Sequence, residues 1–166
     1  MPQSAEPLEP TPTIATRDEY LAECRKYLAV RWQHQGRSLK GIDCAGLLVV
    51  PALTLGILQA TDDVTDYGRT PHDDTLTVLL HKHCRRLDDW RTAQPADILA
   101  IKYAGPQPQH LMVVTKSYDV RWGFHVIHAY GNTEMGGSVV EHRLDEGWLK
   151  SVRGKIHAAF HIDGIG

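Results

Sequence analysis

Cys44 is the residue of this sequence whose setting best suits nucleophilic chemistry. A cysteine attacks as its thiolate, and the unpaired N–H groups and dipole at a helix N-terminus lower the pKa of a thiol. Cys44 follows Asp43, a preferred N-cap residue, and precedes an apolar run. The small residues Ala45 and Gly46 leave room for a substrate backbone. A cysteine that only packs the core is the simpler alternative. The choice between the two interpretations therefore depends on whether catalytic partners lie near Cys44.

The partners that a cysteine nucleophile needs are a histidine that takes its proton and a polar group that holds the imidazole. His110 opens the apolar segment HLMVV, and His128 lies in the next apolar segment, VIHAY. Adjacent antiparallel strands can present two such side chains on one face. The chain contains 10 histidines, so spacing alone leaves both residues open as ordinary strand residues.

One domain with an extended arm is predicted. Residues 1–15 hold four of the nine prolines and few large apolar side chains, so they cannot pack a core of their own. A domain of residues 16–166 should begin with a helix, because Thr16 and Glu19 form a T-x-x-E capping box before apolar residues at helical spacing. Cys24 lies on the buried face of this helix and is expected to act as a small hydrophobic residue.

Two more helices are expected in the first half of the chain. One begins at Asp43, and Pro51 should kink or end it near Val50. The other runs from Thr75 to about Leu87. The polar or acidic segments between the helices contain Gly, Asp and Pro and are predicted to be loops.

The second half of the chain has the spacing of β-strands. Short β-branched or aromatic runs, separated by turn residues, lie at 97–102, 110–116, 121–130, 137–144 and 155–162. Helices followed by closely spaced strands favour an α+β fold with an antiparallel sheet of about five strands over repeated βαβ units. This arrangement would let the helix that begins at Asp43 meet the sheet at one cleft.

Composition excludes several function classes. The chain has 166 residues and a formal net charge of −2, which fits one domain and argues against a nucleic-acid binder. The longest apolar stretch, residues 45–58, is too short and too interrupted for a membrane span. The first residues lack a basic segment followed by an apolar segment, which is the pattern of a signal peptide. We therefore expect the protein to be made in the cytoplasm and not exported by a signal peptide. Three cysteines argue against a disulfide framework.

No metal site is predicted. His81, His83 and Cys84 cluster in sequence but lack the spacings of zinc sites. The aspartates of residues 61–74 lack the regular alternation of a calcium-binding loop. A solvated loop and an exposed helix face explain these residues more simply.

The segment GIDCAGL, residues 41–47, resembles the nucleophile motif of the NlpC/p60 family of cysteine peptidases. In that family an aromatic residue and a Gly-containing loop precede G-[hydrophobic]-D-C-[small]-G-[hydrophobic]. QPADILAIK, residues 94–102, and HLMVV followed by VIHAY resemble two further motifs of the family, in the same order. Trp32 stands where the family more often has Tyr, and this change removes a hydroxyl group. The resemblance covers residues 27–130.

The resemblance implies a papain-like α+β domain that hydrolyses amide bonds in peptidoglycan stem peptides without a cofactor. It assigns Cys44 as the nucleophile, His110 as the general base and acid, and His128 as the residue that orients His110. Trp32 and Asp43 are expected to contact the substrate.

The stretch GRSLKGIDCAGL resembles in particular the phage-tail branch of this family. That branch implies a virion component of the tail tip or baseplate, delivered with the particle to the periplasmic cell wall, which it opens locally during DNA delivery. Residues 1–15 would bind a tail hub or baseplate protein. Two alternatives stay open: a catalytically silent structural subunit of the tail tip, and another papain-like amide hydrolase such as an interbacterial amidase effector or an acyltransferase.

Overall fold

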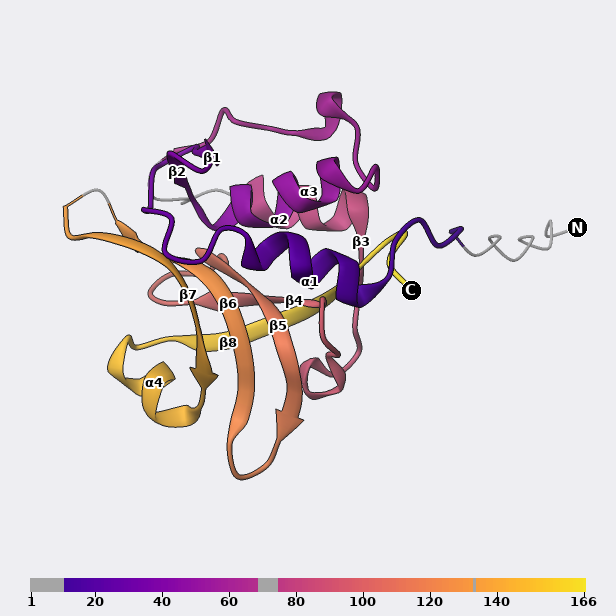
Figure 1. Cartoon of the computed structure of the whole chain (residues 1–166). Coiled ribbons are helices and arrows are strands. Elements are labelled where there is room, and N and C mark those ends of the chain that lie inside the picture. The colour runs from indigo at the N-terminus through magenta and orange to yellow at the C-terminus, as the bar shows by residue number, and fades with distance from the viewer. Residues whose placement is uncertain (1–10, 69–74, 133) are drawn as a thin grey trace, which may run out of the picture.

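The computed structural model describes residues 11–68, 75–132 and 134–166, and it confirms the α+β class (Figure 1). The helices are α1 (Arg17–Arg25), α2 (Cys44–Thr54), η1 (Ala60–Asp62), α3 (Thr75–His83), η2 (Trp90–Thr92) and α4 (Glu146–Ser151). The strands are β1 (Arg37–Ser38), β2 (Gly41–Ile42), β3 (Cys84–Arg86), β4 (Ile98–Lys102), β5 (His110–Asp119), β6 (Gly123–Asn132), β7 (Gly136–Leu144) and β8 (Lys155–Ile162). No described helix is long and apolar enough to cross a membrane.

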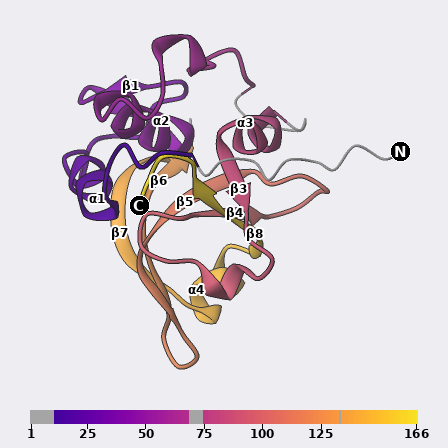
Figure 2. The ribbon, with the colours of Figure 1, turned by 90° about the vertical axis from the view of Figure 1, so that its right-hand side faces the viewer.

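Six strands form one sheet in the order β3-β8-β4-β5-β6-β7, and every neighbouring pair is antiparallel. Helices α1, α2 and α3 cover one face, and α4 lies on the other (Figures 1 and 2). Because side chains alternate along a strand, each face has its own apolar core. Leu111 and Val113 pack toward α1–α3, whereas Met112 and Val114 pack on the side of α4.

Helix α1 begins as predicted. Thr16 and Glu19 form a complete capping box, in which each side chain bonds the other residue's backbone N–H. Cys24 is fully buried on the face that packs against α2, and burial raises the pKa of its thiol to about 12. Cys24 is therefore a core residue, as expected.

Pro51 does not end the second helix near Val50, because α2 continues to Thr54 with Pro51 inside it, and a kink at Pro51 stays a prediction. Proline lacks an N–H, so the carbonyl of Leu47 cannot receive its usual intrahelical hydrogen bond. The Sγ–H of Cys24 donates to this carbonyl, with a sulfur–oxygen distance of 3.8 Å. A neighbouring helix thus supplies a replacement donor that helical spacing alone could not reveal.

The third helix is shorter than predicted, since α3 ends at His83. Residues Cys84–Arg86 form β3 instead and pair with β8, with Cys84 opposite Ile162. A short segment can satisfy its backbone hydrogen-bonding groups in a helix or at a sheet edge. Here residues 84–86 pair with the edge of β8, which would otherwise have unpaired backbone groups. Helix α4 was not predicted; it begins at the N-cap Asp145, which accepts from the N–H of Trp148 at 2.9 Å.

The end of the predicted arm contacts the C-terminal segment. Ile14 donates its N–H to the carbonyl of Gly164 at 2.7 Å, and Ala15 forms a β-bridge with Ile165. Residues 1–10, the greater part of the arm, lie outside the described residues. The arm's role in binding a hub protein stays a prediction.

Candidate active site

Asp43 and Gly46 build the start of α2, which carries Cys44 as its first residue. The Oδ1 of Asp43 caps the helix by accepting from the N–H of Gly46 at 2.8 Å. A side chain at position 46 would collide with the carbonyl oxygen of Gly36. The glycine of the motif is therefore required so that the preceding loop can pack against the first turn of α2.

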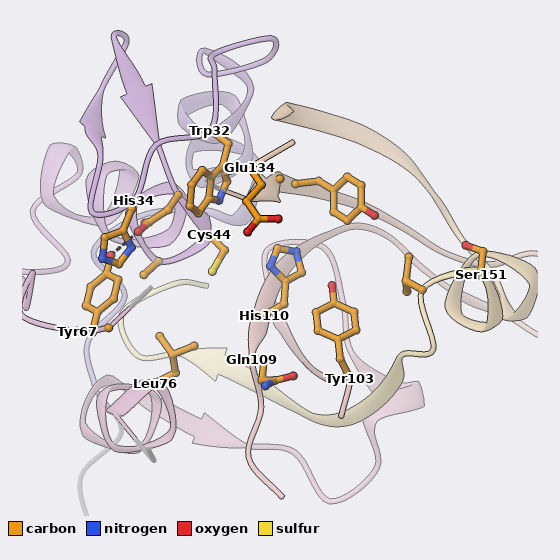
Figure 3. Close-up of a pocket in the computed structure, with 16 residues that line it drawn as sticks. Trp32, His34, Cys44, Tyr67, Leu76, Tyr103, Gln109, His110, Glu134 and Ser151 are labelled. Carbon is orange, nitrogen blue, oxygen red and sulfur yellow. Dashed lines mark hydrogen bonds between the residues drawn. The ribbon is translucent and has the colours of Figure 1, made fainter. Parts of the chain in front are cut away.

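Cys44 and His110 line the same pocket, which has a volume of about 640 Å³ (Figure 3). Figure 3 shows the sulfur of Cys44 and the ring of His110 both directed into this space. The backbone N–H of Leu111, the residue after His110, acts to lower the pKa of the Cys44 thiol. The start of α2 and the start of β5 thus meet at the pocket, as the sequence predicted.

His128 lies behind His110, as expected for a residue that orients an imidazole. Nε2 of His110 is 2.6 Å from Nδ1 of His128, and both rings are buried. His128 in turn contacts a residue that sequence reasoning missed: its Nε2 is 2.8 Å from Nε2 of His142. The three histidines lie on the adjacent strands β5, β6 and β7.

Burial keeps the reacting groups neutral. It raises the pKa of the Cys44 thiol to about 12, with a further contribution from the Asp43 carboxylate. It lowers the pKa of His110 to about 4. The expected lowering of the thiol pKa at the helix start is thus outweighed, although the N–H groups of Leu111 and Ala45 do act in that direction. At neutral pH the site holds a thiol beside a neutral imidazole.

The histidine pair should make folding stability depend on pH. Burial lowers the pKa of His128 to about 2 and that of His110 to about 4, from an ordinary value of 6.5. Below pH 6.5 the unfolded chain binds protons that the folded protein does not, so stability is lost as the pH falls from 6.5 toward 4. The loss should approach about 1.4 kcal/mol per pH unit for each histidine.

Urea unfolding at several pH values from about 7 down to 5 measures this loss. His128→Asn removes one titrating group at similar volume and should show a smaller decrease in unfolding free energy per pH unit than the wild type. Equal slopes for the two proteins would mean that His128 is not held neutral by its surroundings.

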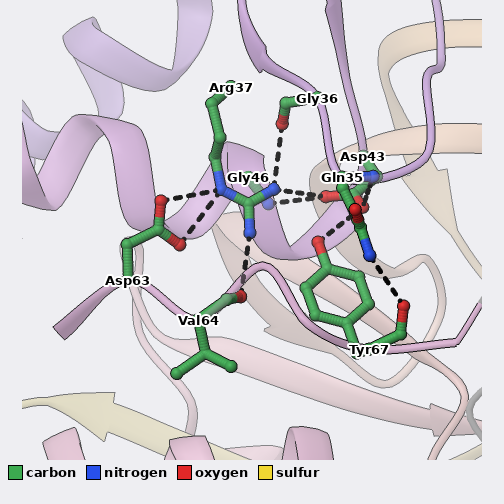
Figure 4. A network of polar contacts seen from close by, with 8 residues as sticks. All are labelled: Gln35, Gly36, Arg37, Asp43, Gly46, Asp63, Val64 and Tyr67. Atoms are coloured by element: carbon green, nitrogen blue, oxygen red, sulfur yellow. Dashed lines mark hydrogen bonds and ion pairs between the residues drawn. The ribbon is translucent and has the colours of Figure 1, made fainter. Parts of the chain in front are cut away.

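Asp43 holds the segment that precedes α2 and the segment that carries Tyr67. Its Oδ2 accepts from the N–H of Gln35 at 2.7 Å and from the hydroxyl of Tyr67 at 2.6 Å (Figure 4). Its Oδ1 accepts from Gly46 and, at 3.1 Å, from Nη1 of Arg37. Four donors fill the positions of a carboxylate that is 3% exposed. Asp43 therefore has a positioning role; it also lines the pocket, and the substrate contact expected from the sequence stays a prediction.

Arg37 connects this carboxylate to the segment that follows η1. Its Nε lies 3.1 Å from both oxygens of Asp63, and its Nη2 donates to the carbonyl of Val64 at 3.3 Å (Figure 4). The segment then reaches the pocket at Tyr67, whose hydroxyl bonds Asp43. The guanidinium group thus links β1, the start of α2 and one wall of the pocket.

Arg37→Lys should lower the free energy of unfolding by about 1–3 kcal/mol, because an ammonium group keeps the charge but cannot bond all these acceptors at once. Chemical denaturation measures the change. The control is Arg25→Lys, which alters the exposed ion pair with Glu141 and should cost less than about 1 kcal/mol. Equal small losses in the two variants would contradict a bracing role for Arg37.

Aromatic residues form much of the remaining wall. Trp32 lines the pocket, as expected of a residue that contacts substrate, and its ring stacks against His34 with centroids 6.5 Å apart. Sequence reasoning missed Tyr67 and Tyr103. Tyr103 stacks on His110 with centroids 6.2 Å apart; its only sequence signal is its place directly after the predicted strand of residues 97–102. Substrate binding by Trp32 stays a prediction.

Within the described ranges, no group of three or more His, Cys, Asp or Glu side chains is arranged to hold a metal ion. The polar side chains of the pocket are instead spread over its walls, with Tyr103, Gln109, Glu134 and Ser151 among them (Figure 3). A pocket of this kind can hold an extended polar ligand such as a peptide.

Comparison with known proteins adds to the description of the fold. Neither a protein-family model nor a curated protein sequence matches the chain. A solved structure of the NlpC/p60 domain of peptidoglycan hydrolase SagA is similar, with a TM-score of 0.58 and 16% identity. The match covers 89% of this chain and 99% of that one. The chain therefore shares the α+β fold of an NlpC/p60 domain.

Proposed function

We propose that this protein is a cysteine peptidase that hydrolyses amide bonds in peptidoglycan stem peptides. The observation that carries the proposal is the joint placement of Cys44 and His110 in one pocket, with Nδ1 of His128 hydrogen-bonded to Nε2 of His110. The fold shared with a domain of a peptidoglycan hydrolase supports the substrate class. The GIDCAGL motif supports the assignment of Cys44 as the nucleophile.

The first half of the reaction forms a thioester. His110 takes the proton of the Cys44 thiol while the sulfur attacks the amide carbonyl carbon, so that a C–S bond forms and the carbonyl oxygen becomes an oxyanion. Backbone N–H groups at the start of α2 stabilise this oxyanion, and each such donor contributes about 3 kcal/mol. The imidazolium form of His110 then protonates the leaving nitrogen, and the C–N bond breaks.

The second half returns the enzyme to its starting state. His110, now neutral, takes a proton from water, and the hydroxyl oxygen attacks the thioester carbon. The C–S bond breaks, and the proton held by His110 returns to the sulfur. His128 serves both halves, because its Nδ1 lies 2.6 Å from Nε2 of His110 and stabilises the imidazolium whenever it forms.

Digestion of defined substrates tests the function. The purified protein is incubated with stem peptides, with disaccharide-linked stem peptides and with an acyl acceptor, and the products are analysed by mass spectrometry. We expect a mass gain of one water and two fragments, separated at the bond from D-glutamate to the diamino acid. Release of intact stem peptide from the sugar would indicate an amidase, and acyl transfer would indicate an acyltransferase. No product from any substrate would favour a structural subunit.

Delivery by a phage-like tail is a second part of the proposal, and it depends on the resemblance of GRSLKGIDCAGL to the phage-tail branch. In this proposal the protein is a component of the tail tip and acts at the periplasmic cell wall, with residues 1–15 bound to a hub protein. Mass spectrometry of purified particles from a producing strain should detect the chain, and deletion of residues 1–15 should remove it from the particles. Full incorporation of the deleted form would contradict a role for the arm.

A further inference from the structure

We propose that His142 is a positioning residue that sets the direction of the hydrogen bonds through His128 to His110 and so keeps the catalytic nitrogen of His110 free of hydrogen. The inference rests on the proposed function for its catalytic meaning. Its structural part, the location of each ring hydrogen, does not depend on the proposed function. The cluster extends the expected pair of histidines by one residue on the next strand, β7.

The direction of the hydrogen bonds is set at the outer end of the cluster. Nδ1 of His142 is 2.8 Å from the carbonyl oxygen of Arg143. A carbonyl oxygen only accepts, so this nitrogen must carry a hydrogen. With one ring hydrogen, His142 has a lone pair on Nε2, the atom that lies 2.8 Å from Nε2 of His128.

The same reasoning fixes the two inner rings. Nε2 of His128 must donate to His142, so Nδ1 of His128 has the lone pair. Nε2 of His110, at 2.6 Å, must then donate to that lone pair. The remaining nitrogen of His110, Nδ1, is left without hydrogen and can accept the proton of the Cys44 thiol. We assign these tautomers from the hydrogen-bond network, and one backbone carbonyl determines all of them.

The surroundings of His142 hold the cluster in place. Trp148 packs on the ring of His142 with centroids 5.1 Å apart and meets the ring of His128 edge-on at 5.7 Å. Tyr130 packs against both Trp148 and His128. This aromatic cover limits the access of water, which could otherwise donate to or accept from either ring nitrogen and so erase the preference for one tautomer.

Nitrogen-15 NMR of the histidine rings tests the assignment directly, since multiple-bond spectra distinguish Nδ1–H from Nε2–H tautomers. In the wild-type protein we expect hydrogen on Nε2 of His110, on Nε2 of His128 and on Nδ1 of His142. In His142→Leu, which removes the acceptor, His128 and His110 should each show a mixture of tautomers. Hydrogen on Nδ1 of His110 in the wild type, or unchanged spectra in His142→Leu, would overturn the proposal.

Turnover of the stem peptide supplies the functional readout. His142→Leu should lower kcat/KM by about tenfold to a hundredfold, as loss of an outer hydrogen-bond partner does elsewhere. His142→Gln offers an amide oxygen as acceptor and should recover most of the loss. His125→Leu, on β6 and outside the pocket, is the matched control and should keep wild-type turnover. Equal loss in the Leu and Gln variants would contradict the positioning role.

The two readouts separate the two proposals. If the wild type cleaves no peptide while its rings show the expected tautomers, the proposed function fails and the hydrogen-bond direction stands. If the wild type cleaves peptide and the tautomers differ, the function stands and the role of His142 fails. Thermal unfolding of each variant shows whether a loss of turnover reflects loss of fold.

Discussion

Cys44→Ala is expected to abolish peptide hydrolysis, with kcat/KM lowered by about 10⁴-fold or more. The sulfur is the only atom of the pocket assigned to bond the substrate carbon, so its loss removes the thioester route and cannot be offset by His110. The residual rate is measured by incubating the variant with a stem peptide for a long time and quantifying the products by chromatography. The variant should unfold at nearly the wild-type temperature, because alanine keeps helix α2 and only the sulfur is removed.

A matched cysteine variant separates chemistry from folding. Cys84→Ala alters a half-buried thiol on β3, outside the pocket, and should retain wild-type turnover. Iodoacetamide should inactivate the wild type and Cys84→Ala to the same extent, because both proteins retain Cys44 and lose activity when it is alkylated. If Cys44→Ala kept more than about a tenth of the wild-type rate, Cys44 could not be the nucleophile.

The sequence was sufficient for features that local chemistry determines. The capping box at Thr16, the N-cap at Asp43 and the strand of residues 155–162 all lie where they were predicted. Each depends on residues within a few positions of one another along the chain. Gly46 differs from these features, because the sequence predicted room for a substrate there, whereas in the structure its missing side chain lets the carbonyl of Gly36 approach α2.

Features that depend on a distant partner were not predictable. Pro51 is accommodated in α2 because Cys24, on another helix, bonds the carbonyl that the proline leaves free. Residues Cys84–Arg86 form a strand because β8 offers them an edge. Both outcomes follow from packing between elements, which local spacing does not encode.

The candidate site shows the same division. The GIDCAGL motif pointed to Cys44, and the two strand motifs of the same resemblance pointed to His110 and His128, which spacing alone had left open. His142 could not be recognised, because its contact with His128 depends on the register of β6 and β7, in which His128 is opposite Val140. A residue two positions further along β7 then lies diagonally across from His128, within reach of a long side chain. The neutral state of Cys44 was missed for a related reason, since burial is a property of the assembled pocket.

His110→Ala tests the assignment of the general base and is expected to lower kcat/KM at neutral pH by about 10²–10⁴-fold. The shape of the pH profile is the sharper measurement. In the wild type, burial holds the pKa of His110 at about 4 and that of the Cys44 thiol at about 12. Both groups keep the required protonation state between these values, so kcat/KM should be nearly level from about pH 5.5 to 8.5.

Without His110, the residual reaction depends on thiolate formed by loss of a proton to solvent. Well below the pKa of about 12, that fraction rises about tenfold for each pH unit, and the residual rate should rise with it. His157→Ala, a half-buried histidine on β8 outside the pocket, should keep the level wild-type profile. A level profile in His110→Ala would show that another group takes the proton of the Cys44 thiol. A tenfold rise per pH unit in the wild type would show that His110 does not take this proton. His110 is already neutral above about pH 4, so a rate that depends on it should not rise with the hydroxide concentration.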